Sequence, residues 1–126
     1  MLKKSNSILD CCPTINIKLA GDAFKYKGSV AGIYYIQPGF SNGQRYWMSP
    51  DGNAIWYVND EDEGSIFVIG QLGNLGTSIV PLYASLKDPS KQCPHDNLQS
   101  NWWYETGKGF KEDIDNSILV QCVPPS

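Results

Sequence analysis

The chain has 126 residues, with 41% hydrophobic side chains, 18% charged side chains and a formal net charge of −3. This length fits a single domain, and the composition excludes a disordered chain or a coiled coil. The 10 basic side chains form no cluster, which excludes nucleic acid as the expected partner, because binding phosphates requires concentrated Lys and Arg.

The predicted domain organisation is simple. Residues 1–10 have no hydrophobic pattern and are expected to be a flexible arm, residues 11–123 form one β domain, and residues 124–126 are a tail. No apolar run has the length of a membrane span, and the N-terminal residues lack the apolar stretch of a secretory signal. We therefore expect no membrane span in this chain.

Strands account for most of the predicted elements. From Thr14 onward, Ile15, Ile17 and Leu19 alternate with polar residues, which is the pattern of a half-buried strand. Runs of β-branched and aromatic residues then follow one another, with Gly, Asn, Asp and Pro between them. These runs predict strands over 29–37, 44–49, 54–58, 65–72, 77–85, 101–105 and 117–123.

The predicted fold class is all-β, as a single compact sandwich or small barrel of seven or eight short, mostly antiparallel strands. Pro81 makes the strand over 77–85 an edge strand or a broken one. No segment shows the apolar spacing of an amphipathic helix, so we expect helix only as a turn near 85–90 or 111–115.

The cysteines are even in number, at Cys11, Cys12, Cys93 and Cys122. Two disulfides could form in any of three connectivities, whereas four reduced thiols would indicate a cytosolic protein. We favour a bond from Cys12, before the first strand, to Cys122, in the last. Its loop of about 110 residues would add on the order of 4 kcal/mol to the stability.

Adjacent aromatic residues recur in the predicted strands. Because successive strand residues point to opposite faces, each such pair places one ring in the core and the other outside. These rings can pack in the core, form a protein interface or stack on sugars. The candidate binding residues are Tyr35, Trp47, Trp56, Trp102 and Trp103.

Two other segments carry side chains of chemical interest. The acidic turn over 59–64 offers Asp60, Asp62 and Glu63 as oxygen ligands for calcium, although its spacing matches no EF-hand. No other cofactor is indicated. His95, the only histidine, follows Cys93 closely, and this pair is the basis for an alternative function as a small Cys/His hydrolase.

One set of motifs resembles a known type of module. The motifs are G-x-Y ending at Tyr34, N-G-x-x-Y ending at Tyr46, I-W-Y over 55–57, and Cys93-Pro94 with a following Trp. In this order they resemble small aromatic β modules of extracellular proteins in marine animals and protists. The resemblance implies a disulfide-stabilised β fold with no known active site.

These observations predict a non-catalytic structural or adhesive binding module. We expect it on an extracellular assembly or particle surface, including a virion capsid or tail decoration, with other protein subunits or its own copies as partners. The alternative is a lectin-like carbohydrate-binding module that binds glycans through the outward rings together with Asp51, Asn53 or the 59–64 turn.

Overall fold

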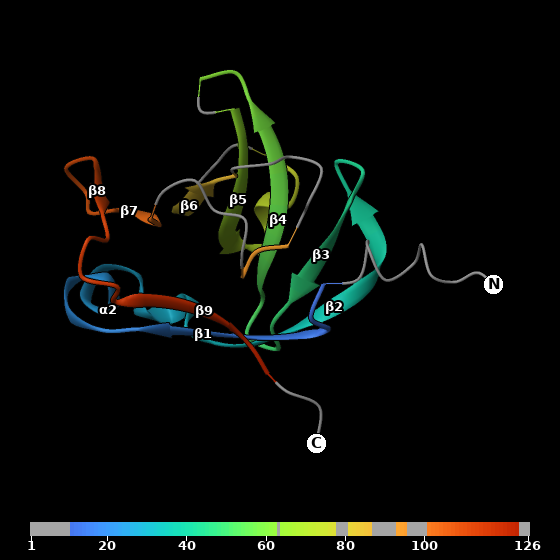
Figure 1. Cartoon of the computed structure of the whole chain (residues 1–126), viewed down its shortest axis with the longest axis horizontal. Helices are drawn as coiled ribbons and strands as arrows, with labels where there is room; N and C mark the ends of the chain where they lie inside the picture. The colour runs from blue at the N-terminus through green and yellow to red at the C-terminus, as the bar shows by residue number, and fades with distance from the viewer. Residues whose placement is uncertain (1–10, 63, 78–80, 87–92, 96–100, 124–126) are drawn as a thin grey trace.

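The structure is a computed structural model that describes residues 11–62, 64–77, 81–86, 93–95 and 101–123. The predicted arm and tail, 1–10 and 124–126, lie outside these residues. Within the described ranges the chain forms nine strands and one short α-helix (Figure 1). The all-β prediction is confirmed, with nine strands where seven or eight were expected.

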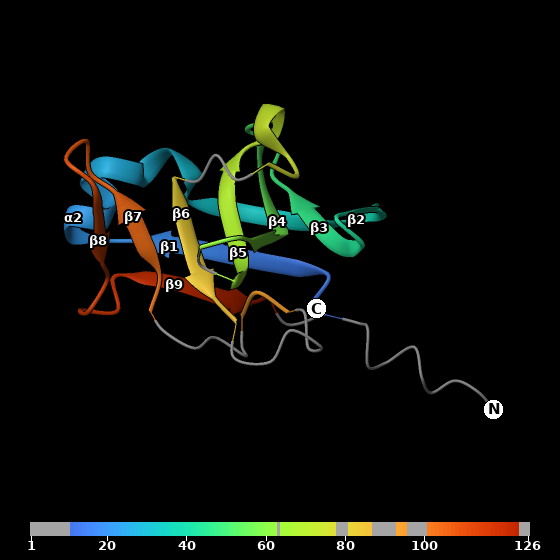
Figure 2. The same ribbon diagram turned by 90° about the horizontal axis from the view of Figure 1, so that it is seen from above.

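All nine strands belong to one antiparallel sheet with the order β8-β7-β6-β5-β4-β3-β2-β1-β9. The sheet is strongly curled into a half-barrel, as Figures 1 and 2 show from two directions. Since every strand is hydrogen-bonded within this one sheet, the barrel-like alternative describes it better than a sandwich. The strands are β1 (Thr14–Leu19), β2 (Gly32–Ser41), β3 (Gln44–Met48), β4 (Asn53–Asp60), β5 (Gly64–Gln71), β6 (Leu82–Ser85), β7 (Trp103–Glu105), β8 (Phe110–Glu112) and β9 (Ile118–Cys122).

The inner face of the sheet carries the main core. Cross-strand pairing links Trp47, Ile55, Ile69, Leu82 and Tyr104 in one row across β3 to β7. All five side chains are buried and belong to one hydrophobic cluster. The alternation seen in the sequence therefore aligns core residues from strand to strand.

A second, smaller core lies on the outer face of β4 and β5. It contains Trp56 and Val68, which are fully buried under Leu72 and Leu75 from the segment after β5. The indole Nε1 of Trp56 donates a hydrogen bond to the Thr77 carbonyl at 3.0 Å. Both faces of this strand pair are thus buried, which explains its nearly continuous run of apolar residues.

The β2–β3 hairpin is longer and its turn tighter than predicted. The predicted strands over 29–37 and 44–49 leave 38–43 as the connection, but β2 continues to Ser41 and only Asn42 and Gly43, both at positive φ, form the turn. An irregularity in the pairing accommodates Pro38 and Gly39. The Arg45 guanidinium donates to the Gln37 carbonyl there, which stabilises the irregular backbone.

The helix prediction was wrong in position. Helix α2 spans Gly21–Lys27 and buries only Ala23, so it has no apolar stripe that the sequence could reveal. Tertiary contacts hold it instead: Lys27 pairs with Glu105 at 3.1 Å, and the Tyr26 ring lies 6.3 Å from that of Tyr104. Of the two segments expected to form a helical turn, 87–90 lies outside the described residues, and β8 occupies 111–112.

Strand β6 begins directly after Pro81, because proline has no backbone N–H to donate to a neighbouring strand. The strand starts at Leu82 and lies between β5 and β7 rather than at an edge. The edge-strand alternative is therefore wrong for β6, and residues 78–80 of the predicted strand lie outside the described residues. Strand β8 was not predicted, because its three residues give too short a pattern.

A buried carboxylate stabilises the connection between β8 and β9 through hydrogen bonds. Asp113 is 5% exposed, and its two carboxylate oxygens accept hydrogen bonds from Ser117 N, Ser117 Oγ and Ile118 N at 2.7 to 3.0 Å. These bonds take the place of the hydrogen bonds to water that the N–H and O–H groups at the start of the edge strand β9 lose on burial.

We expect Asp113→Ala to lower the free energy of unfolding by about 2–4 kcal/mol, because it leaves buried donors without an acceptor. Asp115→Ala, at an exposed position two residues later, is the matched control and should change it by less than about 0.5 kcal/mol. Urea unfolding of both variants measures the difference. Equal effects would contradict a structural role for the Asp113 carboxylate.

Candidate functional site

The structure divides the predicted binding residues into buried and accessible ones. Trp47 and Trp56 are fully buried, and Trp102 is 4% exposed, so these three rings belong to the core. Tyr35 is 48% exposed, and Trp103 is half-buried. A surface contact therefore remains a prediction for Tyr35 and Trp103 only.

Trp103 belongs to a cluster of three aromatic rings on the outer face of β6, β7 and β8, which we call the aromatic strip. The Tyr83 and Trp103 rings lie 6.4 Å apart and nearly parallel, with 10° between their planes. The Phe110 ring meets Tyr83 edge-on at 5.2 Å. Tyr83 and Phe110 were missed as binding candidates, although the predicted strand over 77–85 already contained Tyr83.

Strand register explains how the aromatic strip forms. Val68, Tyr83 and Trp103 are directly paired across β5, β6 and β7, so their side chains share the outer face. Val68 is buried, whereas Phe110 at the sheet edge is 44% exposed. Apolar exposure thus increases toward the edge strand β8.

Acidic side chains border the strip. Glu112 is the cross-strand partner of Trp103, and Glu105 is the partner of Phe110. A hydrogen bond from Lys27 lowers the pKa of the Glu105 carboxyl, and the backbone N–H of Gly107 adds to this effect. The Glu105 carboxyl is therefore charged at neutral pH, where it pairs with Lys27.

A polar pocket of about 390 Å³ is lined in part by Glu105. Its polar lining comes from Tyr26, Lys27, Ser29, Asn53, Gln71 and Asn74. The Asn53 amide donates to the Ser29 carbonyl at 2.9 Å, which fixes its orientation in the wall. This volume and its amide and hydroxyl groups suit a small polyhydroxylated molecule.

The predicted calcium ligands do not gain a third carboxylate from elsewhere in the described chain. Asp60 ends β4, and its carboxylate accepts a hydrogen bond from the Asp62 backbone N–H at 3.0 Å, as in an ordinary turn. Glu63 lies outside the described residues. The calcium site therefore stays a prediction without further support.

The cysteines form two disulfides, Cys11–Cys93 and Cys12–Cys122. The predicted Cys12–Cys122 bond is thus confirmed, and it joins neighbouring strands because Ile15 pairs with Cys122. Two disulfides indicate an oxidising environment of the extracellular type.

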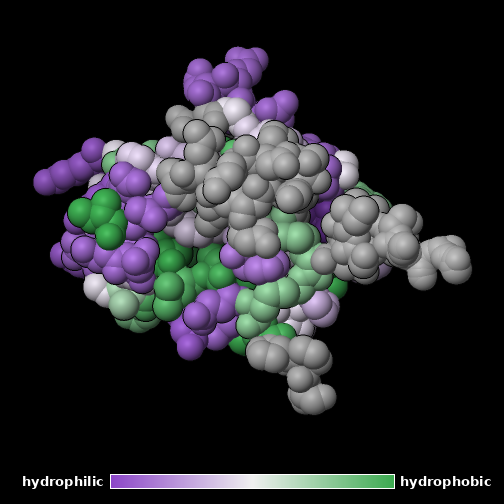
Figure 3. Space-filling model, viewed as in Figure 1, coloured by the Kyte–Doolittle hydropathy of each residue, from purple (hydrophilic) through white to green (hydrophobic). Residues whose placement is uncertain are grey.

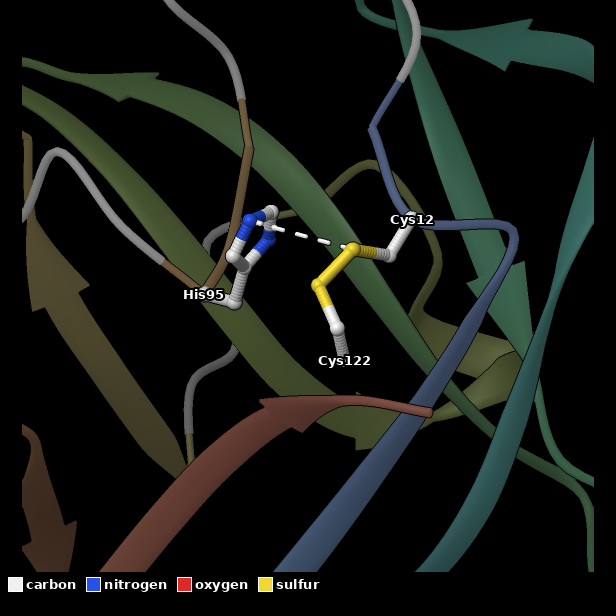
Figure 4. Close-up of side chains that lie close together, drawn as sticks. All are labelled: Cys12, His95 and Cys122. Carbon is white, nitrogen blue, oxygen red and sulfur yellow. Dashed lines mark hydrogen bonds between the residues drawn. A yellow bond between two sulfur atoms is a disulfide. The ribbon is translucent and has the colours of Figure 1, made fainter. Parts of the chain in front are cut away.

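His95 lies beside the second of these bonds. Its Nε2 is 3.8 Å from the Cys12 Sγ (Figure 4). Because Cys93 is bonded to Cys11, it has no thiol to act as a nucleophile for His95. The hydrolase alternative therefore has no nucleophile at Cys93 while this bond is closed.

A further pocket runs along β9, between this strand and Trp102. It has a volume of about 630 Å³, and His95, Ile118 and Val120 are among its lining residues. Figure 3 shows apolar surface over β9 with hydrophilic side chains beside it. Leu119, at 39% exposure, contributes to this apolar surface.

Comparisons with known proteins give no relative for this chain. No family model, no curated protein and no solved structure matches it. In the described part of the chain, no helix has the length and apolar character needed to cross a membrane. The resemblance to aromatic β modules therefore stays a prediction based on the motifs alone.

Proposed function

We propose that the protein is a non-catalytic structural module that assembles with protein subunits through the aromatic strip, in an extracellular assembly or on a particle such as a virion. Its own copies are the first partner to test. The observation that supports this most directly is the ordered cluster of Tyr83, Trp103 and Phe110 beside the edge strand β8.

The cluster has the properties of a binding surface. Tyr and Trp give large apolar contact areas with polar groups at the rim, and they are enriched at the centres of protein interfaces. Since Tyr83 already packs against Trp103, little side-chain freedom remains to be lost on binding. Glu112 at the border favours a partner surface that carries Lys or Arg.

The edge position of the strip adds a second support. Strand β8 forms one edge of the sheet, and its residues Phe110 and Lys111 are exposed. Edge strands offer unpaired backbone groups to another chain. A partner that contacts β8 would therefore reach the aromatic strip as well.

Sedimentation velocity over a wide range of protein concentrations tests this proposal. We expect the wild-type chain to form a defined oligomer, and Trp103→Ala to weaken the association by at least about tenfold, which corresponds to about 1.4 kcal/mol. Phe40→Ala is the matched control, because Phe40 is 66% exposed but lies in the β2–β3 hairpin, outside the strip. A wild-type chain that stays monomeric throughout, or equal losses in both variants, would refute the proposal.

The polar pocket supports a second candidate, a carbohydrate-binding module. Asn53 was a predicted sugar contact, and it lines this pocket together with the Tyr26 ring. In a glycan-binding panel, we expect Asn74→Ala to abolish any signal that the pocket produces, and Trp103→Ala to leave it unchanged. Absence of binding across a broad panel would eliminate this candidate.

A further inference from the structure

We infer that Cys12, Cys122 and His95 form a redox-gated binding site for a thiophilic metal ion such as Zn²⁺. The Sγ atoms of both cysteines and a ring nitrogen of His95 lie within 4.8 Å of one another, and Figure 4 shows the three side chains converging. In the described part of the chain, this is the one group of three or more potential ligands that converges in this way. The inference is independent of the aromatic strip and of the function proposed for it.

The ligand set and its spacing suit zinc. Thiolate sulfur and imidazole nitrogen are the preferred ligands, and tetrahedral Zn–S and Zn–N bonds of about 2.3 and 2.0 Å place neighbouring S and N atoms about 3.5 Å apart. The Cys12 Sγ lies 3.8 Å from His95 Nε2 in the disulfide-bonded structure. Rotation of the two cysteine side chains would separate the sulfurs, while their Cα atoms stay 5.6 Å apart.

The fold holds these ligands in place from three directions. Cys12 lies two residues before the start of β1, Cys122 ends β9, and the two strands are hydrogen-bonded to each other. His95 comes from a distant segment that the Cys11–Cys93 bond attaches next to Cys12. Because His95 also lines the pocket along β9, a metal ion can reach the site from solvent.

The Cys12–Cys122 disulfide controls metal binding, because its two sulfurs become ligands only after the bond is reduced. A phosphine reductant takes up an oxygen atom from water to become a phosphine oxide, while the sulfur–sulfur bond breaks and the sulfurs gain two hydrogens. Binding of one divalent ion then releases two protons, as both thiols become thiolates. Opening of this bond first is favoured because both of its cysteines are half-buried, whereas in the Cys11–Cys93 bond only Cys93 is half-buried and Cys11 is 7% exposed.

In either redox state, the same residues would tie the start of β1 to the end of β9. The disulfide does so under oxidising conditions, and the metal ion does so under reducing ones. The inference thus assigns His95 a metal-binding role that exists only in the reduced protein.

Titration of the phosphine-reduced protein with Co²⁺, as a spectroscopic substitute for zinc, tests the site. We expect one ion per chain, thiolate-to-cobalt charge-transfer absorption, and protection of Cys12 and Cys122 from alkylation. Since His95 is the only histidine, paramagnetically shifted imidazole signals in the NMR spectrum would identify it as a ligand. The oxidised protein should bind no Co²⁺ and should show neither the charge-transfer absorption nor the shifted imidazole signals.

Two variants complete the test. His95→Ala should weaken Co²⁺ binding by more than about tenfold, since even residues that only orient a metal ligand contribute about 10–100-fold. Asp60→Ala in the acidic turn is the control and should leave binding unchanged. Absence of charge-transfer absorption, protection of other cysteines, or unshifted imidazole signals would overturn the inference, whether or not the His95 variant folds.

Discussion

Replacing Trp47 with alanine is expected to lower the free energy of unfolding by about 3–5 kcal/mol, a large fraction of the stability of about 5–15 kcal/mol that a domain of this size has. The Trp47 side chain is fully buried in the main core, and its indole Nε1 donates a hydrogen bond to the Cys12 carbonyl at 2.9 Å. Alanine would leave a large cavity and remove the donor. Equilibrium urea unfolding under non-reducing conditions measures the loss from the shift of the midpoint.

Two further replacements separate the causes of this loss. Trp47→Phe keeps most of the apolar contact but removes the indole N–H, so we expect it to cost less than Trp47→Ala by about 1–3 kcal/mol. Trp103→Ala removes a ring of the same type from a half-buried position and should cost less than about 1.5 kcal/mol. A larger loss for Trp103→Ala than for Trp47→Ala would contradict the assignment of the two rings to surface and core.

The second large effect is expected from the paired substitution of Cys12→Ser and Cys122→Ser. The bond links residues 110 apart in sequence, and its loss should lower the free energy of unfolding by about 4 kcal/mol, because the unfolded chain regains the entropy that the crosslink removes. Non-reducing urea unfolding of the double variant measures this loss.

The matched control is Cys11→Ser with Cys93→Ser, which opens a loop of 82 residues. Loop-closure entropy depends on the logarithm of loop length, so we expect the two double variants to differ by only about 0.3 kcal/mol from this cause. Intact mass after alkylation of the denatured, unreduced wild-type chain should show no added groups. Four added groups would mean that neither disulfide forms, and the expected loss would then disappear.

Local sequence patterns predicted most of the strands because these strands bury one face in the main core, whereas β8 buries no residue. Alternation identified β1, and runs of β-branched and aromatic residues identified β2 to β5. Alternation could not reveal that Trp56, on the opposite face, is buried as well, since its cover comes from Leu72 and Leu75 in a separate segment. Helix α2 was missed for a related reason, because contacts with β7 and β8 stabilise it rather than an apolar stripe of its own.

The candidate sites were less accessible to sequence reasoning than the fold. Trp103 could be selected from its position between Trp102 and Tyr104, but the packing of its ring against Tyr83 depends on strand register. His95 is 83 residues from Cys12 in sequence. Their proximity results from the Cys11–Cys93 bond, and no spacing rule for metal ligands describes such an arrangement.

The pairing of β1 with β9 has a consequence for how the chain folds. Every other pair in the sheet joins strands that are consecutive in sequence, from β1–β2 to β7–β8. Such local pairs close short loops with little loss of chain entropy, whereas β9 must reach a strand that lies a full domain length away. While the Cys12–Cys122 bond is open, we therefore expect the meander from β1 to β8 to form first and β9 to dock last. Since contacts that form after the transition state affect mainly the unfolding rate, a substitution that weakens the β1–β9 contacts should speed unfolding more than it slows folding.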